Sequence, residues 1–168
     1  MAGGWEIKEG IRDDLPRMER LWRFLYAHHS EVTTAALPFV TADERWPERL
    51  REFRQSMDDG AGAFLIAEGG GEDLGFAFST MRPASPIFSG GAIGELEVLV
   101  VLPERRGQGI GEALVRRSQV ALREMGATTL KVVVLAGNDA ALRLYRRLGI
   151  EPALIELLAP LKAPGESA

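Results

Sequence analysis

A glycine-rich turn beside two arginines carries the clearest chemical signal in the sequence. The apolar run Val98–Leu102 stops at Pro103, and Arg105, Arg106 and the segment Gly107–Gly111 follow before a helical pattern begins. Glycine lets the backbone take positive φ and lets a ligand approach the main chain closely. The first N–H groups of a helix lack intrahelical partners, and the positive end of the helix dipole favours an anion. These features predict a cradle for a phosphate group.

The spacing of the glycines excludes two common kinds of phosphate site. A P-loop ends in Gly-Lys-Ser/Thr, and this turn has no such ending. The dinucleotide fingerprint needs glycines at its first, third and sixth positions. The sixth position is Glu112 when counted from Gly107 and Leu114 when counted from Gly109. A turn that only joins a strand to a helix therefore remains the alternative interpretation of this segment taken alone.

A second stretch with chemical potential runs from Asn138 to Ile150. Asn138 or Asp139 can cap a helix, and Gly149 can end it. Tyr145 lies on the apolar stripe of this helix. A phenol has an ordinary pKa of about 10, so it is protonated at neutral pH and can donate to a leaving group. From spacing alone, capping is the simpler role for Asn138 and core packing the simpler role for Tyr145.

Together, the two stretches resemble the GNAT superfamily of N-acetyltransferases. Arg106-x-x-Gly109-x-Gly111 after an apolar strand is similar to the coenzyme A pyrophosphate loop of that superfamily. The second stretch is similar to its Asn-x-x-Ala-x-x-x-Tyr-x-x-x-Gly-Phe element, with Ile150 in place of the usual phenylalanine. The motifs have the expected order, with a helix and a strand between them. The resemblance covers nearly all of the chain except its tail.

The resemblance implies acetyl-CoA as co-substrate and no metal. In similar proteins two parallel strands splay apart, and the first binds the pantetheine arm through its main chain, as an added strand would. That strand would contribute Leu99, Val100 and Val101 here. Asn138 would hydrogen-bond the arm near the thioester. The turn would hold the pyrophosphate, and its expected binding residues are Arg106, Gly107, Gln108, Gly109, Ile110, Gly111 and Glu112.

The same resemblance makes Tyr145 the expected general acid, next to the cofactor thiolate that it protonates. Glu95 matches the strand glutamate that serves as general base in histone-type relatives. Glu97 is two residues further along the strand, so it should point to the same face. Either carboxylate, directly or through water, can take the proton of the amine. A solvated start of the strand is an equally open interpretation of both glutamates.

The elements that must position these residues follow from hydrophobic periodicity. Helical spacing follows Asp13 or Asp14, spans residues 43–57, and recurs after the glycine turn and after Asn138. Six segments have the pattern of strands: 5–11, 63–68, 74–81, 95–102, 128–135 and 150–158. This order predicts an α/β domain over residues 1–158, with helices on both faces of a mixed sheet. The resemblance implies a largely antiparallel sheet with a central pair of splayed parallel strands. Residues 159–168 are expected to be a flexible tail.

Composition narrows the classes of function. The chain has 24 acidic and 20 basic residues and a formal net charge of −4, which argues against a broad nucleic-acid-binding surface. It has no cysteine, so disulfides, thiolate metal sites and a cysteine nucleophile are excluded. No apolar run is long enough to span a membrane, and the first residues lack the pattern of a secretory signal. We therefore expect a cytoplasmic protein without a membrane partner.

The sequence thus predicts an acetyl-CoA-dependent N-acetyltransferase that transfers an acetyl group directly to a primary amine in a ternary complex. The lack of cysteine favours direct attack over an acyl-enzyme. The acceptor is expected to be a small-molecule or peptide amine, and its identity is open. A homodimer is a further expectation, since similar enzymes are often dimers. The main alternative is a non-catalytic acyl-CoA-binding or sensor domain, against which the presence of both Asn138 and Tyr145 argues.

Overall fold

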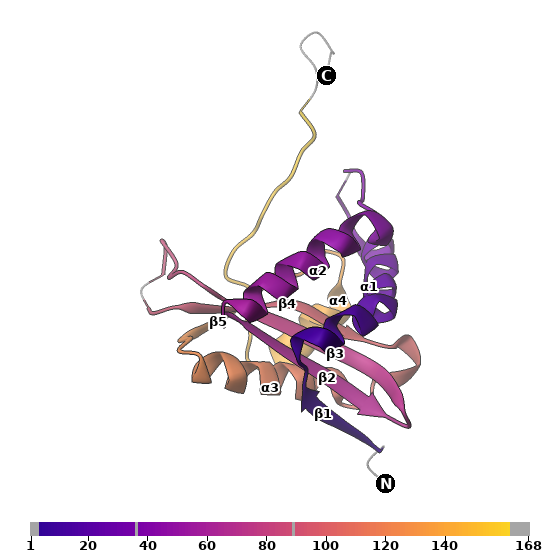
Figure 1. Ribbon diagram of the computed structural model, residues 1–168. Coiled ribbons are helices and arrows are strands. Elements are labelled where there is room, and N and C mark those ends of the chain that lie inside the picture. Colours follow the sequence, from indigo (N-terminus) through magenta and orange to yellow (C-terminus); the bar gives the residue numbers. More distant parts are fainter. Residues whose placement is uncertain (1–3, 36, 89, 162–168) are drawn as a thin grey trace.

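A computed structural model of the protein describes residues 4–35, 37–88 and 90–161, and its centre is one open sheet (Figure 1). Neighbouring strands are antiparallel except for the last two, which are parallel. The strands lie side by side in chain order: β1 (Trp5–Glu9), β2 (Gly62–Gly69), β3 (Glu72–Arg82), β4 (Ile93–Val101) and β5 (Thr129–Val132). The predicted mixed, largely antiparallel sheet is confirmed. Its parallel pair lies at one edge and not in the centre, because no described strand follows β5.

Helices cover both faces of this sheet, as predicted (Figure 1). Helices α1 (Glu19–Val32) and α2 (Ala42–Asp58) pack on one face, and α3 (Ile110–Glu124) packs on the other. Helix α4 (Asp139–Arg147) lies beside the first turn of α3. Short 3-10 turns precede α1 and follow β4, at η1 (Arg12–Met18) and η2 (Pro103–Arg105).

The two covered faces explain the long apolar runs in the central strands. Four successive residues of β2 and seven of β3 are buried. On the face that α1 and α2 cover, Phe53 of α2 stacks on Phe78 of β3, with ring centroids 4.0 Å apart. This contact fixes α2 over the sheet. It also places Arg49, one turn earlier, with its guanidinium 4.8 Å from the centre of the Phe53 ring.

The first helix begins later than the sequence predicts. Asp13 and Asp14 do not cap an α-helix, because the seven residues before Glu19 form the 3-10 turn η1. Pro16 lies inside this turn and lacks the N–H that a regular helix would use. Asp14 still acts locally, since its Oδ2 accepts a hydrogen bond from the N–H of Ile11 at 3.0 Å.

The predicted last strand over residues 150–158 is wrong. Residues 151–161 have no regular structure and are exposed. Their apolar sequence is typical of a strand, but a strand also needs a neighbour, and Pro152 removes one donor. Ile150 alone remains packed against the core, and its N–H donates to the carbonyl of Tyr145 at 3.0 Å.

One further boundary in the C-terminal half differs from the prediction, and another is not tested. Strand β5 ends at Val132 and not at Leu135, where the apolar pattern ends. Most of the predicted tail, residues 162–168, lies outside the described residues. The domain boundary at residue 158 therefore stays a prediction.

Candidate active site

The glycine turn places main-chain donors at the start of α3. Gly109 is the N-cap residue, with φ +84°, and Gly107 has φ +74°. A Cβ at either position would meet no atom within 4 Å, so the turn faces open space. Ala113 donates to the carbonyl of Gly109 at 3.0 Å and closes the first helical bond. The N–H groups of residues 110–112 are thus available to an anion.

The side chains around the turn are largely engaged elsewhere. Ile110 is buried and anchors the helix start. Glu112 pairs with Arg116 at 2.9 Å, and Arg106 Nε donates to the carbonyl of Val101 at 3.3 Å. Recognition by this turn therefore depends mainly on its backbone. A hollow of about 190 Å³ adjoins the turn and is lined by Gly4, Trp5, Gly69, Gly70, Leu74, Arg105 and Gln108.

Strands β4 and β5 are paired over only part of their length. Their register begins with Ile93 opposite Thr129 and ends with Leu96 opposite Val132, while β4 continues to Val101. The second half of β4 thus has β3 on one side and no described strand on the other. This opening leads to the glycine turn.

Within the open half of β4, successive residues face opposite sides. The carbonyl oxygen of Val100 lies only 2.5 Å from the position of a Cβ on Gly75, so it faces β3. Main-chain groups alternate between the two sides of a strand, so Leu99 and Val101 direct theirs toward the opening. Of the three strand residues expected to bind pantetheine, Val100 therefore faces away.

Asn138 and Tyr145 both belong to α4. Asn138 is its N-cap, because Oδ1 accepts a hydrogen bond from the N–H of Ala141 at 3.1 Å. Its amide nitrogen has no hydrogen-bond partner among the residues of the described ranges. Tyr145 is 7% exposed, and burial raises the pKa of its hydroxyl above the ordinary value. The phenol is therefore protonated throughout the neutral range.

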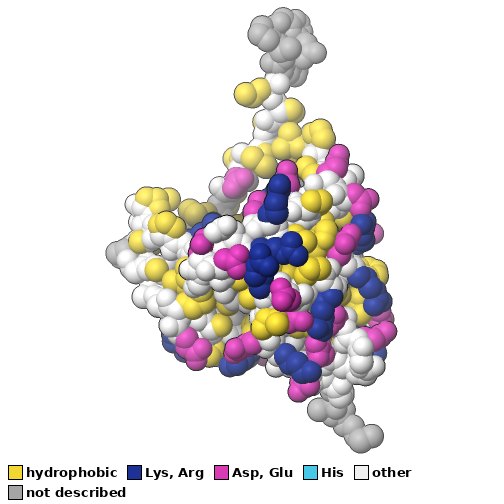
Figure 2. Space-filling view, in the orientation of Figure 1, with side chains coloured by type: hydrophobic (Ala, Val, Ile, Leu, Met, Phe, Trp, Pro, Cys, Tyr) yellow, Lys and Arg dark blue, Asp and Glu magenta, His cyan; other side chains and the backbone are white. Residues whose placement is uncertain are grey.

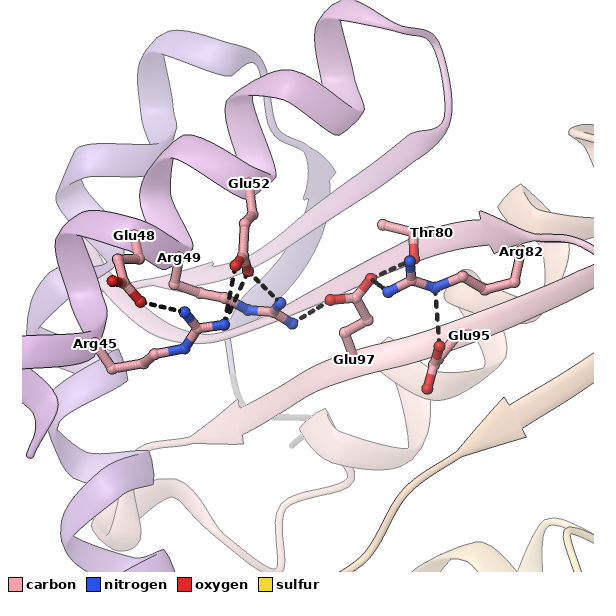
Figure 3. A network of polar contacts seen from close by, with 8 residues as sticks. All are labelled: Arg45, Glu48, Arg49, Glu52, Thr80, Arg82, Glu95 and Glu97. Carbon is pink, nitrogen blue, oxygen red and sulfur yellow. Dashed lines mark hydrogen bonds and ion pairs between the residues drawn. The ribbon is translucent and has the colours of Figure 1, made fainter. Parts of the chain in front are cut away.

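The two candidate carboxylates lie side by side on the face of β4 that α2 covers (Figure 3). Arg82 of β3 joins them, since Nε contacts Glu95 at 3.0 Å and Nη2 contacts Glu97 at 2.8 Å. This shared partner confirms that both carboxylates point to the same face. Glu97 also accepts from Arg49 of α2 and from the hydroxyl of Thr80. Its side chain is 7% exposed, against 13% for Glu95.

A β-bulge sets the position of Glu97. Phe78 of β3 pairs with Val98, and the next residue, Ser79, pairs with Leu96. Glu97 is thus the extra residue of β4. Bulges re-aim a side chain and increase the local twist of a strand, and they are frequent beside active sites.

Several residues of this network were missing from the sequence prediction. Arg49 and Arg82 carry the ion pairs of Glu97, and Lys131 of β5 contacts Glu95 Oε1 at 3.0 Å. A buried glutamate on a strand signals that cations must lie nearby. The sequence holds many arginines and gives no indication of which ones face β4.

Helices α1 and α2 form the roof over these carboxylates. Tyr26 and His29 of α1 lie with Phe39 in a cluster whose ring centroids are 5.8–6.5 Å apart. Burial raises the pKa of Tyr26, and burial followed by the charge of His28 lowers the pKa of His29. Across the face drawn in Figure 2, acidic and basic side chains are intermixed.

The end of α1 also touches the segment that leads into α4. A Cβ on Gly137 would lie 2.1 Å from the carbonyl oxygen of Val32 and 3.2 Å from Thr34 Cγ2. Only glycine fits this approach. The contact joins the helical roof directly to the residue before Asn138.

The described ranges lack both a candidate metal-binding cluster and a membrane-spanning helix. None contains a group of three or more histidine, aspartate or glutamate side chains suited to a metal ion. None of the helices in the same ranges combines the length and apolar character needed to cross a bilayer.

Curated proteins with sequences similar to this chain include mycothiol acetyltransferases. A mycothiol acetyltransferase of Saccharomonospora viridis is 35% identical over 160 residues, which are 90% of this chain and 52% of that protein. A mycothiol acetyltransferase of Pseudarthrobacter chlorophenolicus is 38% identical over 124 residues, 74% of this chain and 35% of that protein. The chain thus spans about half the length, or less, of these relatives.

Solved structures share the fold. A GCN5-related N-acetyltransferase from Ralstonia eutropha has a TM-score of 0.74 at 24% identity, covering 94% of this chain and 99% of its own. An aminoglycoside N-acetyltransferase in complex with CoA has a TM-score of 0.73 at 19% identity, covering 97% and 98%. At 19% and 24% identity, this similarity is evidence for a shared fold and for nothing more.

A family model matches the part of the chain that holds the glycine turn, the opening between β4 and β5, and helix α4. Residues 22–150 match the acetyltransferase (GNAT) family, and this range includes β2 to β5 and both motif stretches. The matched range exceeds half of the chain, so the protein belongs to the acetyltransferase (GNAT) family.

Proposed function

We propose that the protein is an N-acetyltransferase that moves the acetyl group of acetyl-CoA to a primary amine by direct transfer in a ternary complex. The observation that carries this proposal is the opening between β4 and β5, which ends at the free N–H groups of α3. Main-chain donors along a strand followed by an anion cradle suit a pantetheine arm and its pyrophosphate. Family membership supports the same assignment.

In this proposal, main-chain groups bind most of the acetyl donor, acetyl-CoA. Leu99 offers its N–H and carbonyl toward the opening and Val101 offers its N–H, while the Val101 carbonyl accepts from Arg106. The amide nitrogen of Asn138 is free to donate to the arm. The turn from Gly107 to Glu112 binds the pyrophosphate through its N–H groups. The open space at Gly109 fits this close approach, because a Cβ there would meet no protein atom.

Acyl transfer requires two proton transfers, formation of a C–N bond and cleavage of the C–S bond. The amine loses a proton, and its nitrogen bonds to the acyl carbon. A main-chain N–H facing the opening, from Leu99 or Val101, stabilises the oxyanion that forms. The C–S bond then breaks, and the departing thiolate takes the proton of Tyr145, which burial keeps on the phenol until then.

The two glutamates have different surroundings, and this supports different roles. Glu97 is held by Arg49, Arg82 and Thr80, so it links α2 to β4. Glu95 is the more exposed of the two, and among the described residues its ion-pair partners are Arg82 and Lys131. We assign Glu95 as the proton acceptor, directly or through water. Glu97 is the residue that positions the roof and Arg82 around it.

The acceptor is proposed to be a small-molecule amine. Relatives are named for mycothiol, and a structural neighbour is named for aminoglycosides.

A screen of amines tests the function. Purified protein is incubated with acetyl-CoA and a panel of amino acids, aminoglycosides, polyamines, amino sugars and peptide N-termini, and released thiol is measured. Turnover with at least one amine is expected, with loss of turnover in Gly109→Val. This variant places a β-branched side chain where the backbone meets the pyrophosphate.

Calorimetry with CoA separates the rival interpretations. The wild type is expected to bind CoA, and folded Gly109→Val is expected to bind it far more weakly. Binding without turnover for any amine would favour a non-catalytic acyl-CoA sensor. Failure of the wild type to bind CoA would reject both functions.

A further inference from the structure

One amine of the chain itself lies against the carboxylate that we assign as proton acceptor. Lys131 of β5 is paired in register with Glu95 of β4, and its Nζ lies 3.0 Å from Glu95 Oε1. A proton acceptor must be within hydrogen-bond reach of the amine that it deprotonates, at about 2.6–3.2 Å. The Nζ of Lys131 meets this requirement in the structure as it stands.

The pair of Lys131 and Glu95 also borders the closed end of the opening between β4 and β5. The two strands are paired as far as Leu96 and Val132, and Lys131 directly precedes Val132. In the proposed function the pyrophosphate lies at the glycine turn, at the other end of the opening. An arm that is bound in this way directs its thioester toward the closed end, beside Glu95 and Lys131.

Among the cations around the two glutamates, Lys131 differs in its chemistry. In the described ranges the other ion-pair partners of these carboxylates are Arg49 and Arg82. A guanidinium stays protonated in proteins, whereas a lysine amine can lose its proton and attack a carbonyl carbon. The Lys131 side chain is also 48% exposed. Its flexible four-carbon stem lets the amine turn from Glu95 toward an acyl group in the opening.

We propose that Lys131 occupies the place of the acceptor ammonium at Glu95, and that acetyl-CoA bound to the same chain acetylates its Nζ. The step rests on the proposed function, because it uses the same donor, proton acceptor and proton donor. The ammonium gives one proton to Glu95, and Nζ bonds to the acyl carbon. The C–S bond breaks, and the thiolate takes the proton of Tyr145. Glu95 then releases its proton to solvent and Tyr145 regains one, which leaves acetyl-lysine and the free thiol of CoA.

Acetylation changes the charge beside Glu95. An acetylated lysine is neutral and forms no ion pair, so Arg82 remains as the cation of the described ranges that contacts Glu95. An unmodified Lys131 competes with an external amine for this carboxylate, and an acetylated Lys131 does not. The modification is therefore expected to lower the KM of the external amine.

The chain contains a matched control for selective acetylation. It has three lysines, Lys8, Lys131 and Lys162, of which Lys162 lies outside the described residues. Lys8 is 50% exposed and pairs with Glu6 and Glu68, but β1 carries it at the opposite edge of the sheet from β5. Free acetyl-CoA that reacts with surface amines would label Lys8 and Lys131 alike. A donor held in the opening would label Lys131.

Peptide mass spectrometry after incubation with acetyl-CoA, without an added amine, tests the modification. The protein is first treated with a lysine deacetylase, so that each lysine starts unmodified. Acetylation of Lys131 is expected to be roughly 10²-fold faster than that of Lys8, the scale of positioned acid–base catalysis, and independent of protein concentration. Tyr145→Phe should slow the reaction at Lys131 and leave the rate at Lys8 unchanged.

Three outcomes of this experiment would overturn the proposal. They are equal rates at Lys8 and Lys131, a rate at Lys131 that rises in proportion to protein concentration, and an unmodified Lys131 in protein that binds CoA. A protein that fails to bind CoA in calorimetry would instead reject the proposed function, and self-acetylation with it.

Two substitutions test the competition for Glu95. Lys131→Arg keeps a cation that cannot be acetylated in this way, and Lys131→Gln resembles the acetylated side chain. For an amine that the screen identifies, KM should be several-fold lower in Lys131→Gln than in Lys131→Arg, with a similar KM for acetyl-CoA in both. Lys8→Gln is the control and should leave both values as in the wild type. Equal amine KM values in the two Lys131 variants would overturn the place assigned to Lys131.

Discussion

Among single residues, Tyr145 combines an observed packing role with the proton-donor role that we propose for it. Its ring is buried on the inner face of α4, and the same burial raises the pKa of its hydroxyl. Burial keeps this phenol neutral at physiological pH, and it also makes the phenol a weaker acid than a free tyrosine. Helical spacing predicts the buried ring, and only the spacing from Asn138 in the family motif indicates the proton donor.

Replacing Tyr145 by Phe separates these roles. The ring and its packing are kept, so stability should fall by no more than about 1 kcal/mol. CoA affinity should be nearly unchanged, while kcat should fall by roughly 10²-fold. The deficit should shrink for acyl donors whose thiol is more acidic. An unchanged kcat under conditions where chemistry limits turnover would leave Tyr145 with a packing role only.

The two glutamates should respond differently to the same substitution. Glu95→Gln should lower kcat at neutral pH by roughly 10²–10⁴-fold, because the amine loses its proton acceptor. Glu97→Gln should act mainly on the KM of the amine and lower stability by about 1–3 kcal/mol, since Arg49 loses a charged partner. Steady-state kinetics and denaturant unfolding distinguish the two patterns. Equal and small kinetic effects would mean that bulk water takes the proton.

His29 should make stability depend on pH. Burial lowers its pKa in the folded state, so the unfolded chain binds the proton more readily. This contribution is fully present above the ordinary pKa of about 6.5 and is lost as pH falls toward the folded value. The free energy of unfolding should fall less steeply with acidification in His29→Gln than in the wild type. Parallel curves for the two proteins would contradict the assignment.

At the scale of elements, the predictable parts are those fixed by local sequence. The N-cap at Asn138 and the glycine turn before α3 are local, and both were predicted. The strand over 150–158 was not predictable in the same way, because strand formation depends on a distant pairing partner. The 3-10 turn before α1 reflects Pro16, which outweighs the capping signal of Asp13. The ion pairs of Glu97 depend on tertiary packing of α2, which no local pattern specifies.

The contact between α1 and the start of α4 gives an element-scale prediction. In Gly137→Ala, the new methyl group would overlap the Val32 carbonyl oxygen, so α1 or the segment before Asn138 must shift. Stability should fall by about 1–3 kcal/mol, as for other overpacked sites. KM should rise for acetyl-CoA and for the amine together, because the shift affects both sides of the site.

Gly4→Ala is the matched control for this change. A Cβ at Gly4 would meet no atom within 4 Å, so both stability and kinetics should stay near those of the wild type. Kinetics of Gly137→Ala that match the control would show that the contact is only structural.

At the scale of the whole molecule, the sheet is incomplete in two places. It opens between β4 and β5 on the way to the glycine turn, and no strand of the described ranges lies beyond β5. The first gap suits the ligand arm proposed above. The chain spans about half the length, or less, of its curated relatives.

The open half of β4 has a consequence for sequence divergence. The donor binding that we propose there uses main-chain N–H and carbonyl groups, and every residue carries both except proline, which lacks the N–H. Leu99 and Val101 can therefore be exchanged for other strand-forming residues over many generations while the same ligand is retained. Substitution is expected to be restricted instead at Gly137, where a Cβ would lie 2.1 Å from the Val32 carbonyl oxygen, and at Gly109, whose φ of +84° disfavours residues with a side chain.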